Sequence, residues 1–160
     1  MTSESSNAAL DERVGNDPLA LERQVCFALQ VASRSVLALY RPILEEMGLT
    51  HPQYLVMLAL WGSAPLSVKE IGGLLQLDSA TLSPLLKRLE QSGYVSRGRS
   101  ETDERLLVVD LTDAGRRLRD QALGVPPAIV AKLGMQISEL EALHRSLTAL
   151  IAAARSTISS

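Results

Sequence analysis

The chain has 160 residues, of which 46% are apolar and 21% are charged, so it can bury one core but is too short for two ordinary complete domains. Aromatic residues make up only 3% of it, which disfavours a sandwich or barrel of half-buried strands and predicts a mainly helical protein. The net charge of −2 excludes binding to nucleic acid through a strongly basic overall charge.

Cysteine content and the N-terminal segment restrict the class of protein further. The single cysteine, Cys26, excludes an internal disulfide framework and a four-cysteine zinc site. Residues 1–18 have no basic start followed by an apolar core, so we expect a flexible polar tail and not a secretory signal. The longest uncharged run, residues 47–68, includes His51 and two prolines, which argues against a membrane span. These features favour a cytoplasmic protein without a membrane partner.

The first predicted helix extends from Leu21 to about Leu44. Apolar residues recur in this segment at spacings of three and four. Its other faces are also apolar, with Phe27, Val31 and Leu37, which is more apolar surface than one chain of this size can cover. We therefore expect a partner chain to pack against this helix.

Two capping boxes mark the next helices. Residues 50–53 combine a capping threonine, a first-turn proline and a glutamine, which predicts a short buried helix over residues 54–61. A Ser-x-x-Glu box at residues 67–70 predicts a third helix through Leu75. After a tight turn, Asp78 or Ser79 can cap a fourth helix that continues to Gln91.

The hydrophobic period changes after the fourth helix. Residues 94–100 and 105–111 are alternating or β-branched segments on either side of a polar stretch, which predicts a β-hairpin. Thr112 can cap the next helix, and a further helix is expected after residues 125–127. A box at residues 138–141 predicts a last helix with an apolar stripe.

The order of these elements is typical of a winged helix-turn-helix. Two helices joined by a tight turn are followed at once by a hairpin, and four basic residues stand against one acidic residue from Lys87 to Arg99. The second helix of such a pair enters a major groove, and an arginine from the hairpin can enter a minor groove. The expected DNA contacts are Ser79, Thr81, Ser83, Lys87 and Arg88 on the helix, with Arg97, Arg99, Asp103 and Arg105 on the hairpin.

The charges alone would fit a second interpretation. They could form a solvated surface on which Asp103 and Arg105 pair with each other across the turn. The helix-turn-helix order favours double-stranded DNA as the partner.

Several stretches resemble the MarR family of transcriptional regulators, with a resemblance that covers residues 21–155. They are residues 53–61, 77–90 and 99–105, and the helix start Leu111-Thr112-x-x-Gly115. Within that family, Gln24-x-Cys26-Phe27-Ala28-Leu29 and Tyr40-x-Pro42 resemble the organic-hydroperoxide-sensing repressors, OhrR, of the one-cysteine type.

The resemblance implies a homodimer on a pseudo-palindromic operator. Residues 19–160 would form a single MarR-type domain, with dimerisation helices over 19–46 and 112–160 and a winged helix-turn-helix over 50–111.

It also implies that Cys26 is the sensor. Its thiolate would attack an organic hydroperoxide and become a sulfenic acid. Tyr40 is implied as a hydrogen-bond donor to the thiolate. It lies fourteen residues further along, about 21 Å in a straight helix, so we expect the Tyr40 of the other subunit to serve Cys26. Family members commonly have a tyrosine four residues after the cysteine, where this chain has Gln30, whose amide can also donate. Without a second cysteine, a small thiol in a mixed disulfide, a sulfenyl-amide or further oxidation would complete the switch.

Other functions remain open on the sequence. A MarR-type repressor could respond to a small aromatic acid, with Cys26 structural. A thiol-dependent enzyme is disfavoured because Cys26 has neither a resolving cysteine nor a base-bearing motif beside it. Metal sensing would depend on His51, His144 and Cys26, which lack ligand spacing. We expect no enzyme activity, no metal and no cofactor.

Overall fold

The computed structural model describes residues 17–158, so nearly all of the tail expected at residues 1–18 lies outside the described residues. Contacts divide the chain into two compact units, Met1–Leu39 and Tyr40–Ser160. In the first unit, a short 3-10 turn, η1 (Leu21–Arg23), precedes the helix α2 (Val25–Glu45), whose last residues belong to the second unit. The first predicted helix is thereby confirmed, with the 3-10 turn in place of its first residues.

Three helices of the second unit, α3 (His51–Ser63), α4 (Val68–Leu75) and α5 (Ser79–Gln91), begin at the predicted caps. Thr50 and Ser67 each accept a hydrogen bond from the backbone three residues later, and Gln53 and Glu70 close the two boxes. Of the two residues predicted as the N-cap of α5, Asp78 and Ser79, the cap is Asp78, whose carboxylate accepts the N–H of Thr81 at 2.7 Å. The helix-turn-helix is therefore built from local signals that the sequence carries.

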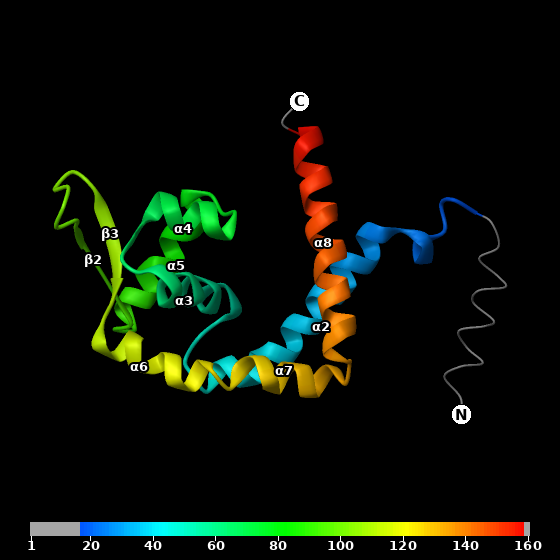
Figure 1. Ribbon diagram of the computed structural model, residues 1–160, viewed down its shortest axis with the longest axis horizontal. Coiled ribbons are helices and arrows are strands. Elements are labelled where there is room, and N and C mark those ends of the chain that lie inside the picture. Colours follow the sequence, from blue (N-terminus) through cyan, green and yellow to red (C-terminus); the bar gives the residue numbers. More distant parts are fainter. Residues whose placement is uncertain (1–16, 159–160) are drawn as a thin grey trace. The chain divides into compact units, whose positions relative to one another are not determined.

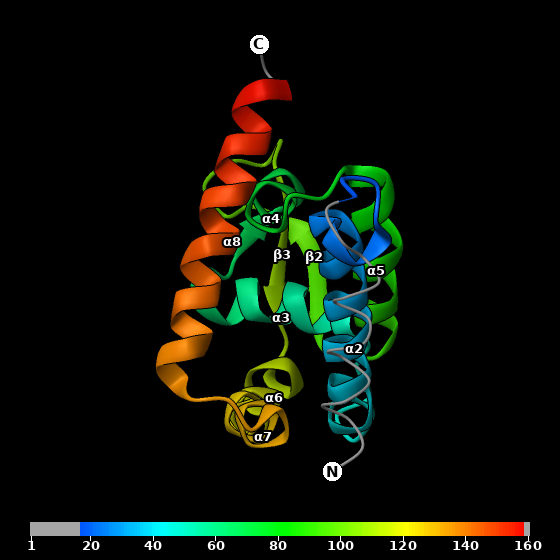
Figure 2. The same cartoon turned by 90° about the vertical axis from the view of Figure 1, so that its right-hand side faces the viewer.

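The hairpin is confirmed, and a third strand joins it. The strands are β1 (Leu66–Ser67), β2 (Val95–Arg99) and β3 (Leu107–Leu111), in the order β1-β3-β2 with antiparallel pairing. Figure 2 shows β2 and β3 side by side, with Arg97 opposite Val109 in the register. The two-residue strand β1 was not predicted because it is too short to show a period of two and overlaps the cap of α4.

Three helices follow the sheet: α6 (Asp113–Ala122), α7 (Val125–Leu133) and α8 (Ile137–Ile158). Thr112 caps α6 as predicted. The starts of the other two were predicted wrongly. Helix α7 begins at Val125 and includes the prolines expected before it, because a proline fits the first turn, where its missing N–H has no partner to lose. Helix α8 begins before the predicted box, and the Glu139 carboxylate accepts the N–H of Gln136 at 2.8 Å.

The core of the second unit lies where α3, α4 and α5 meet the sheet, on one side of Figure 1. Its most deeply buried side chains include Val56, Met57, Leu60, Ile71, Leu82, Leu86, Leu89, Val95 and Val109. Between residues 17 and 158, no helix is both long and apolar enough to cross a membrane.

Candidate nucleic-acid interface and redox site

Helix α5 has one buried face and one open face. Its buried residues are Leu82, Leu85, Leu86 and Leu89. The five predicted contacts on this helix, Ser79, Thr81, Ser83, Lys87 and Arg88, are all exposed. At 100° per residue, Ser79, Ser83 and Lys87 flank one side of the open face and Thr81 and Arg88 flank the other. The exposed face of α5 is thus the face that was predicted to contact DNA.

The N-terminus of α5 already has a negative partner. The hydrogen bond from the Thr81 N–H holds the pKa of the Asp78 carboxyl below its usual value. The Ser83 hydroxyl donates to the Ser79 carbonyl at 2.7 Å and keeps its lone pairs free to accept. Because Asp78 occupies the positive end of the helix dipole, hydroxyl groups are better suited than the helix end itself to contact DNA here.

In the hairpin, two of the predicted arginines have partners within the chain. Arg97 binds Glu90 of α5, with Nη2 at 2.7 Å and Nε at 3.0 Å from the same carboxylate oxygen, and this contact lowers the pKa of Glu90. Arg99 donates to the backbone carbonyl of Glu104 at 2.6 Å. These contacts join β2 to α5 and brace the loop that connects β2 to β3.

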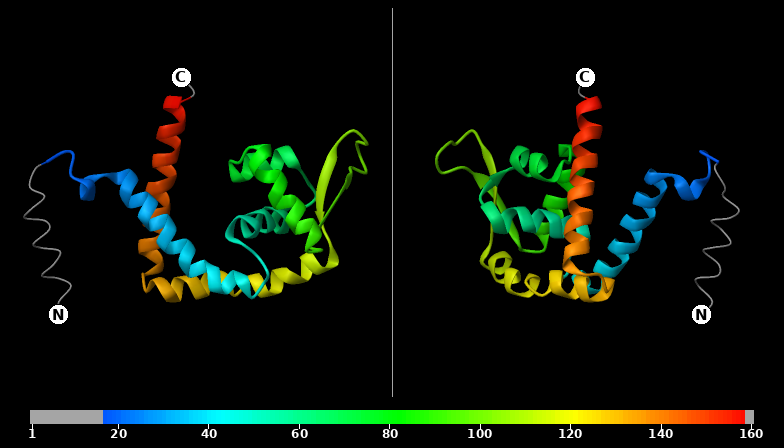
Figure 3. Two further views of the ribbon diagram at one scale, coloured as in Figure 1. Left: turned by 180° about the vertical axis from the view of Figure 1, so that it is seen from behind. Right: turned by 45° about the vertical axis from the view of Figure 1, so that its right-hand side comes forward.

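Arg105 lies in that loop, at the end of the hairpin farthest from α6 in Figures 1 and 3. The Asp103 carboxylate accepts the backbone N–H of Arg105 at 3.0 Å. The ion pairs of this part of the described chain are Arg97 with Glu90 and Arg116 with Asp110, so the side chains of Asp103 and Arg105 do not pair as the second interpretation required. Asp103 shapes the turn, and Arg105 beside it is exposed.

The predicted redox residues occupy two parts of α2. Cys26 is a free, exposed thiol near its start, and Gln30 is exposed one turn later. Tyr40 is half-buried near its end, where its ring meets the edge of His51 with centroids 5.0 Å apart, and Tyr54 lies 6.2 Å away. Burial lowers the pKa of His51 below its usual value and so favours the neutral ring.

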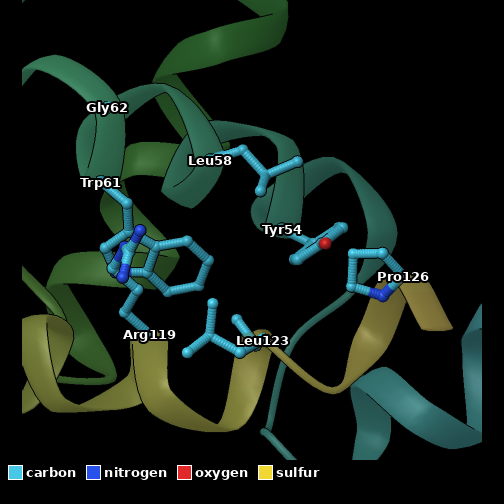
Figure 4. A pocket seen from close by; sticks show the side chains of 8 residues that line it. Tyr54, Leu58, Trp61, Gly62, Arg119, Leu123 and Pro126 are labelled. Atoms are coloured by element: carbon cyan, nitrogen blue, oxygen red, sulfur yellow. The ribbon is translucent and has the colours of Figure 1, made fainter. Parts of the chain in front are cut away.

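An apolar pocket of about 280 Å³ lies between α3 and the start of the C-terminal helices. Figure 4 shows Tyr54, Leu58 and Trp61 on one side, Leu123 and Pro126 on the other, and Arg119 rising from α6. The sequence analysis missed this pocket, although the two aromatic residues two turns apart on a helix could have suggested it.

Sequence reasoning also missed three polar contacts that join the helices of the second unit. The Trp61 indole donates to the Gly115 carbonyl at 2.9 Å, the Tyr94 hydroxyl donates to the Met47 carbonyl at 3.1 Å, and the Thr112 hydroxyl donates to the Gly93 carbonyl at 2.6 Å. Over residues 17–158, no group of three or more His, Cys, Asp or Glu side chains lies close enough together to hold a metal ion.

Comparison with known proteins shows which family of transcriptional regulators the chain belongs to. The family model "Transcriptional regulator SarA/Rot" matches residues 38–122. The chain is 41% identical over 135 residues to the organic hydroperoxide resistance transcriptional regulator of Bacillus subtilis, covering 84% of this chain and 92% of the relative. The chain belongs to the MarR-type family of transcriptional regulators. The name of this relative agrees with the resemblance to the OhrR repressors that the sequence showed.

Two further relatives agree with this MarR-type assignment. The HTH-type transcriptional regulator TtmR of Methylorubrum extorquens is 46% identical over 135 residues, which is 84% of this chain and 69% of TtmR. A crystal structure of overoxidized AbfR bound to DNA, a protein that another structure places in Staphylococcus epidermidis, has a TM-score of 0.63 and 39% identity, covering 81% of this chain and 95% of that one. The protein is a DNA-binding transcriptional regulator, and its family members are regulators and not enzymes.

Proposed function

We propose that this protein is a homodimeric, cytoplasmic repressor that holds a pseudo-palindromic operator while Cys26 is reduced and releases it when an organic hydroperoxide oxidises Cys26. The observation that carries the proposal is the exposed thiol of Cys26 on a helix that, among the described residues, buries only Leu44. The name of the Bacillus subtilis relative supports the effector class. The test is titration of a labelled operator complex with cumene hydroperoxide, followed by fluorescence anisotropy.

A second copy of the chain would cover the two long helices. Helix α8 has 22 residues and buries none of them, and α2 buries only Leu44. On α8, Leu143, Leu150 and Ile151 are 42–48% exposed. Apolar stripes of this length on both helices are typical of surfaces that pack against a partner. We assign residues 19–46 and 112–160 to this dimer interface and residues 50–111 to the DNA-binding module.

The chemistry begins at the Cys26 sulfur. The thiolate attacks one oxygen of the hydroperoxide, so that an S–O bond forms as the O–O bond breaks, and the other oxygen leaves as an alcohol after taking a proton. Tyr40 is about 21 Å from Cys26 along the same helix, so the partner's copy of Tyr40 is the one that donates a hydrogen bond to the thiolate. Gln30, one turn from Cys26, adds an amide donor on the same face.

Because the chain has one cysteine, no disulfide within one chain can follow the sulfenic acid. A small thiol forms a mixed disulfide with it and water leaves. A sulfenyl-amide or further oxidation by a second hydroperoxide are the other routes, and mass spectrometry with and without added thiol distinguishes the three.

On the operator, the open face of α5 reads the major groove. Ser79, Thr81 and Ser83 contact bases or phosphates, and Lys87 and Arg88 neutralise the backbone. Arg105 enters the adjacent minor groove, with the loop around it held by Arg99 and Asp103, while Arg97 keeps the hairpin attached to Glu90 of the reading helix.

Arg105→Ala is expected to weaken operator binding roughly tenfold or more, because an arginine contact is worth about 1–3 kcal/mol. The slope of log affinity against log salt should become shallower by about 2, one contact from each subunit. Anisotropy at several salt concentrations measures both. Arg105→Lys, which keeps the charge at the same position, is the control and should keep the wild-type salt slope. An Arg105→Ala affinity equal to that of the wild type would rule out the wing contact.

Tyr40→Phe is expected to leave repression intact and to slow the peroxide response several-fold, since the hydroxyl that stabilises the thiolate is lost while the ring remains. Stopped-flow measurement of sulfenic acid formation with cumene hydroperoxide tests this prediction. Equal rates for the wild type and Tyr40→Phe would remove Tyr40 from the site.

The pocket of Figure 4 favours one other candidate function. Its aromatic rings, Tyr54 and Trp61, and its cation, Arg119, suit a small aromatic acid, with the carboxylate beside the guanidinium. Salicylate serves as the probe. If salicylate releases the operator and cumene hydroperoxide does not, the ligand-responsive function replaces the redox one.

A further inference from the structure

Tyr94 connects three segments of the second unit that the proposed switch must move together. It is the second residue after Ser92, the C-cap of α5, its hydroxyl contacts the turn that follows α2, and its carbonyl contacts the start of α6. The sequence analysis gave it no role beyond the start of a strand.

On the α5 side, Tyr94 is part of the helix end itself. Its N–H donates to the Leu89 carbonyl at 3.1 Å and the Gly93 N–H donates to the Glu90 carbonyl at 3.0 Å, with Gly93 at a φ of +77°. This pair of bonds is a Schellman cap, which fixes the residues after a helix to its last turn. A displacement of Tyr94 is therefore a displacement of the reading helix.

On the α2 side, the Tyr94 hydroxyl binds the Met47 carbonyl at 3.1 Å. The turn that contains Met47 is itself bound to the end of α2, because the Leu44 carbonyl accepts the N–H groups of Met47 and Leu49, each at 3.0 Å. Leu44 lies one turn after Tyr40 and is buried. A continuous series of contacts thus leads from Tyr40 to α5.

We propose that Tyr94 is a positioning residue that transmits the state of the thiol site to the reading helix through its hydroxyl. This inference rests on the proposed function, since it needs Tyr40 to face the partner's thiol. When oxidation alters the surroundings of Tyr40, the end of α2 shifts, the Met47 carbonyl moves with it, and the Tyr94 hydroxyl carries α5 out of register with the groove.

Tyr94→Phe tests this role in the full-length protein. We expect the reduced variant to bind the operator within about threefold of the wild type, because the core and the Schellman cap remain. Cumene hydroperoxide with a small thiol should oxidise Cys26 at the wild-type rate, as measured by mass spectrometry. The ratio of oxidised to reduced dissociation constants, roughly 5 to 150 for coupled sites, should fall most of the way to 1.

Ile71→Val is the matched control, since it removes one methylene from the fully buried core of the same module without touching Tyr94. Normal release by Ile71→Val and impaired release by oxidised Tyr94→Phe support the inference. Equal release by wild type and Tyr94→Phe overturns it and leaves the proposed function standing. Impaired release by both variants overturns it as well, because lower stability would then explain the loss. Failure of the oxidised wild type to release DNA overturns the redox function itself.

Discussion

Replacing Cys26 by serine is expected to abolish release of the operator by organic hydroperoxides while leaving the affinity of the untreated protein within about twofold of wild type. The change exchanges sulfur for oxygen at a position that is exposed among the described residues, so we expect little effect on packing there. A serine hydroxyl does not react with a hydroperoxide, because the nucleophile in this step is a thiolate. The wild type should lose roughly 5- to 150-fold in affinity on oxidation, the range typical of coupled sites.

Anisotropy of a labelled operator, measured before and after cumene hydroperoxide, gives both affinities for each protein. Because the chain has four methionines, peroxide can also act on sulfur elsewhere, and mass spectrometry identifies which residues have gained oxygen. Release of DNA by treated Cys26→Ser at the wild-type peroxide concentration would show that the thiol is not the sensor. Salicylate in a parallel titration then reports on the pocket around Trp61.

Gly115→Ala is expected to destabilise the protein and impair DNA binding together. A Cβ built at Gly115 would overlap the Tyr94 carbonyl oxygen, and Leu111 would be the next neighbour at 3.3 Å. Because backbone atoms cannot move aside as a side chain can, α6 would have to shift and weaken the Thr112 bonds to Gly93 and Tyr94. Overpacking of this kind costs about 1–3 kcal/mol, which lowers Tm by roughly 2–12 °C in a chain of this size.

Gly73→Ala is the matched control for that experiment. Gly73 is an exposed residue inside α4, and nothing lies within 4 Å of a Cβ built there. Alanine should raise Tm slightly at this position, because glycine is the poorer helix former. Thermal unfolding followed by circular dichroism compares the two variants. Equal melting temperatures for Gly115→Ala and wild type would mean that the α5–α6 junction is loosely packed.

Most of the winged module could be predicted because its signals are local. Thr50, Ser67, Asp78 and Thr112 each cap a helix with a partner three residues away, so short windows of sequence contain the whole interaction. The errors arose where competing local signals were present. The box at residues 138–141 has the right composition, yet Glu139 caps the backbone first, and the helix starts at Ile137.

The exposed face of α5 was predictable for a similar reason, since the helical period alone separates its buried leucines from its polar residues. The contacts around Tyr94 could not be predicted in this way. Its hydroxyl reaches Met47 across 47 positions of sequence, and the Trp61 indole reaches Gly115 across 54. Contacts at that separation follow from the packing of helices, which no spacing in the sequence encodes.

The bond between Arg97 and Glu90 has a practical consequence for experiments on this protein. It fastens the strand β2 to the helix α5, and the Schellman cap at Gly93 joins the same two elements through the backbone. If the proposed release takes place, we therefore expect the hairpin and the helix to move together. A single fluorophore attached beyond β2 would suffice to follow the departure of both from the grooves in real time.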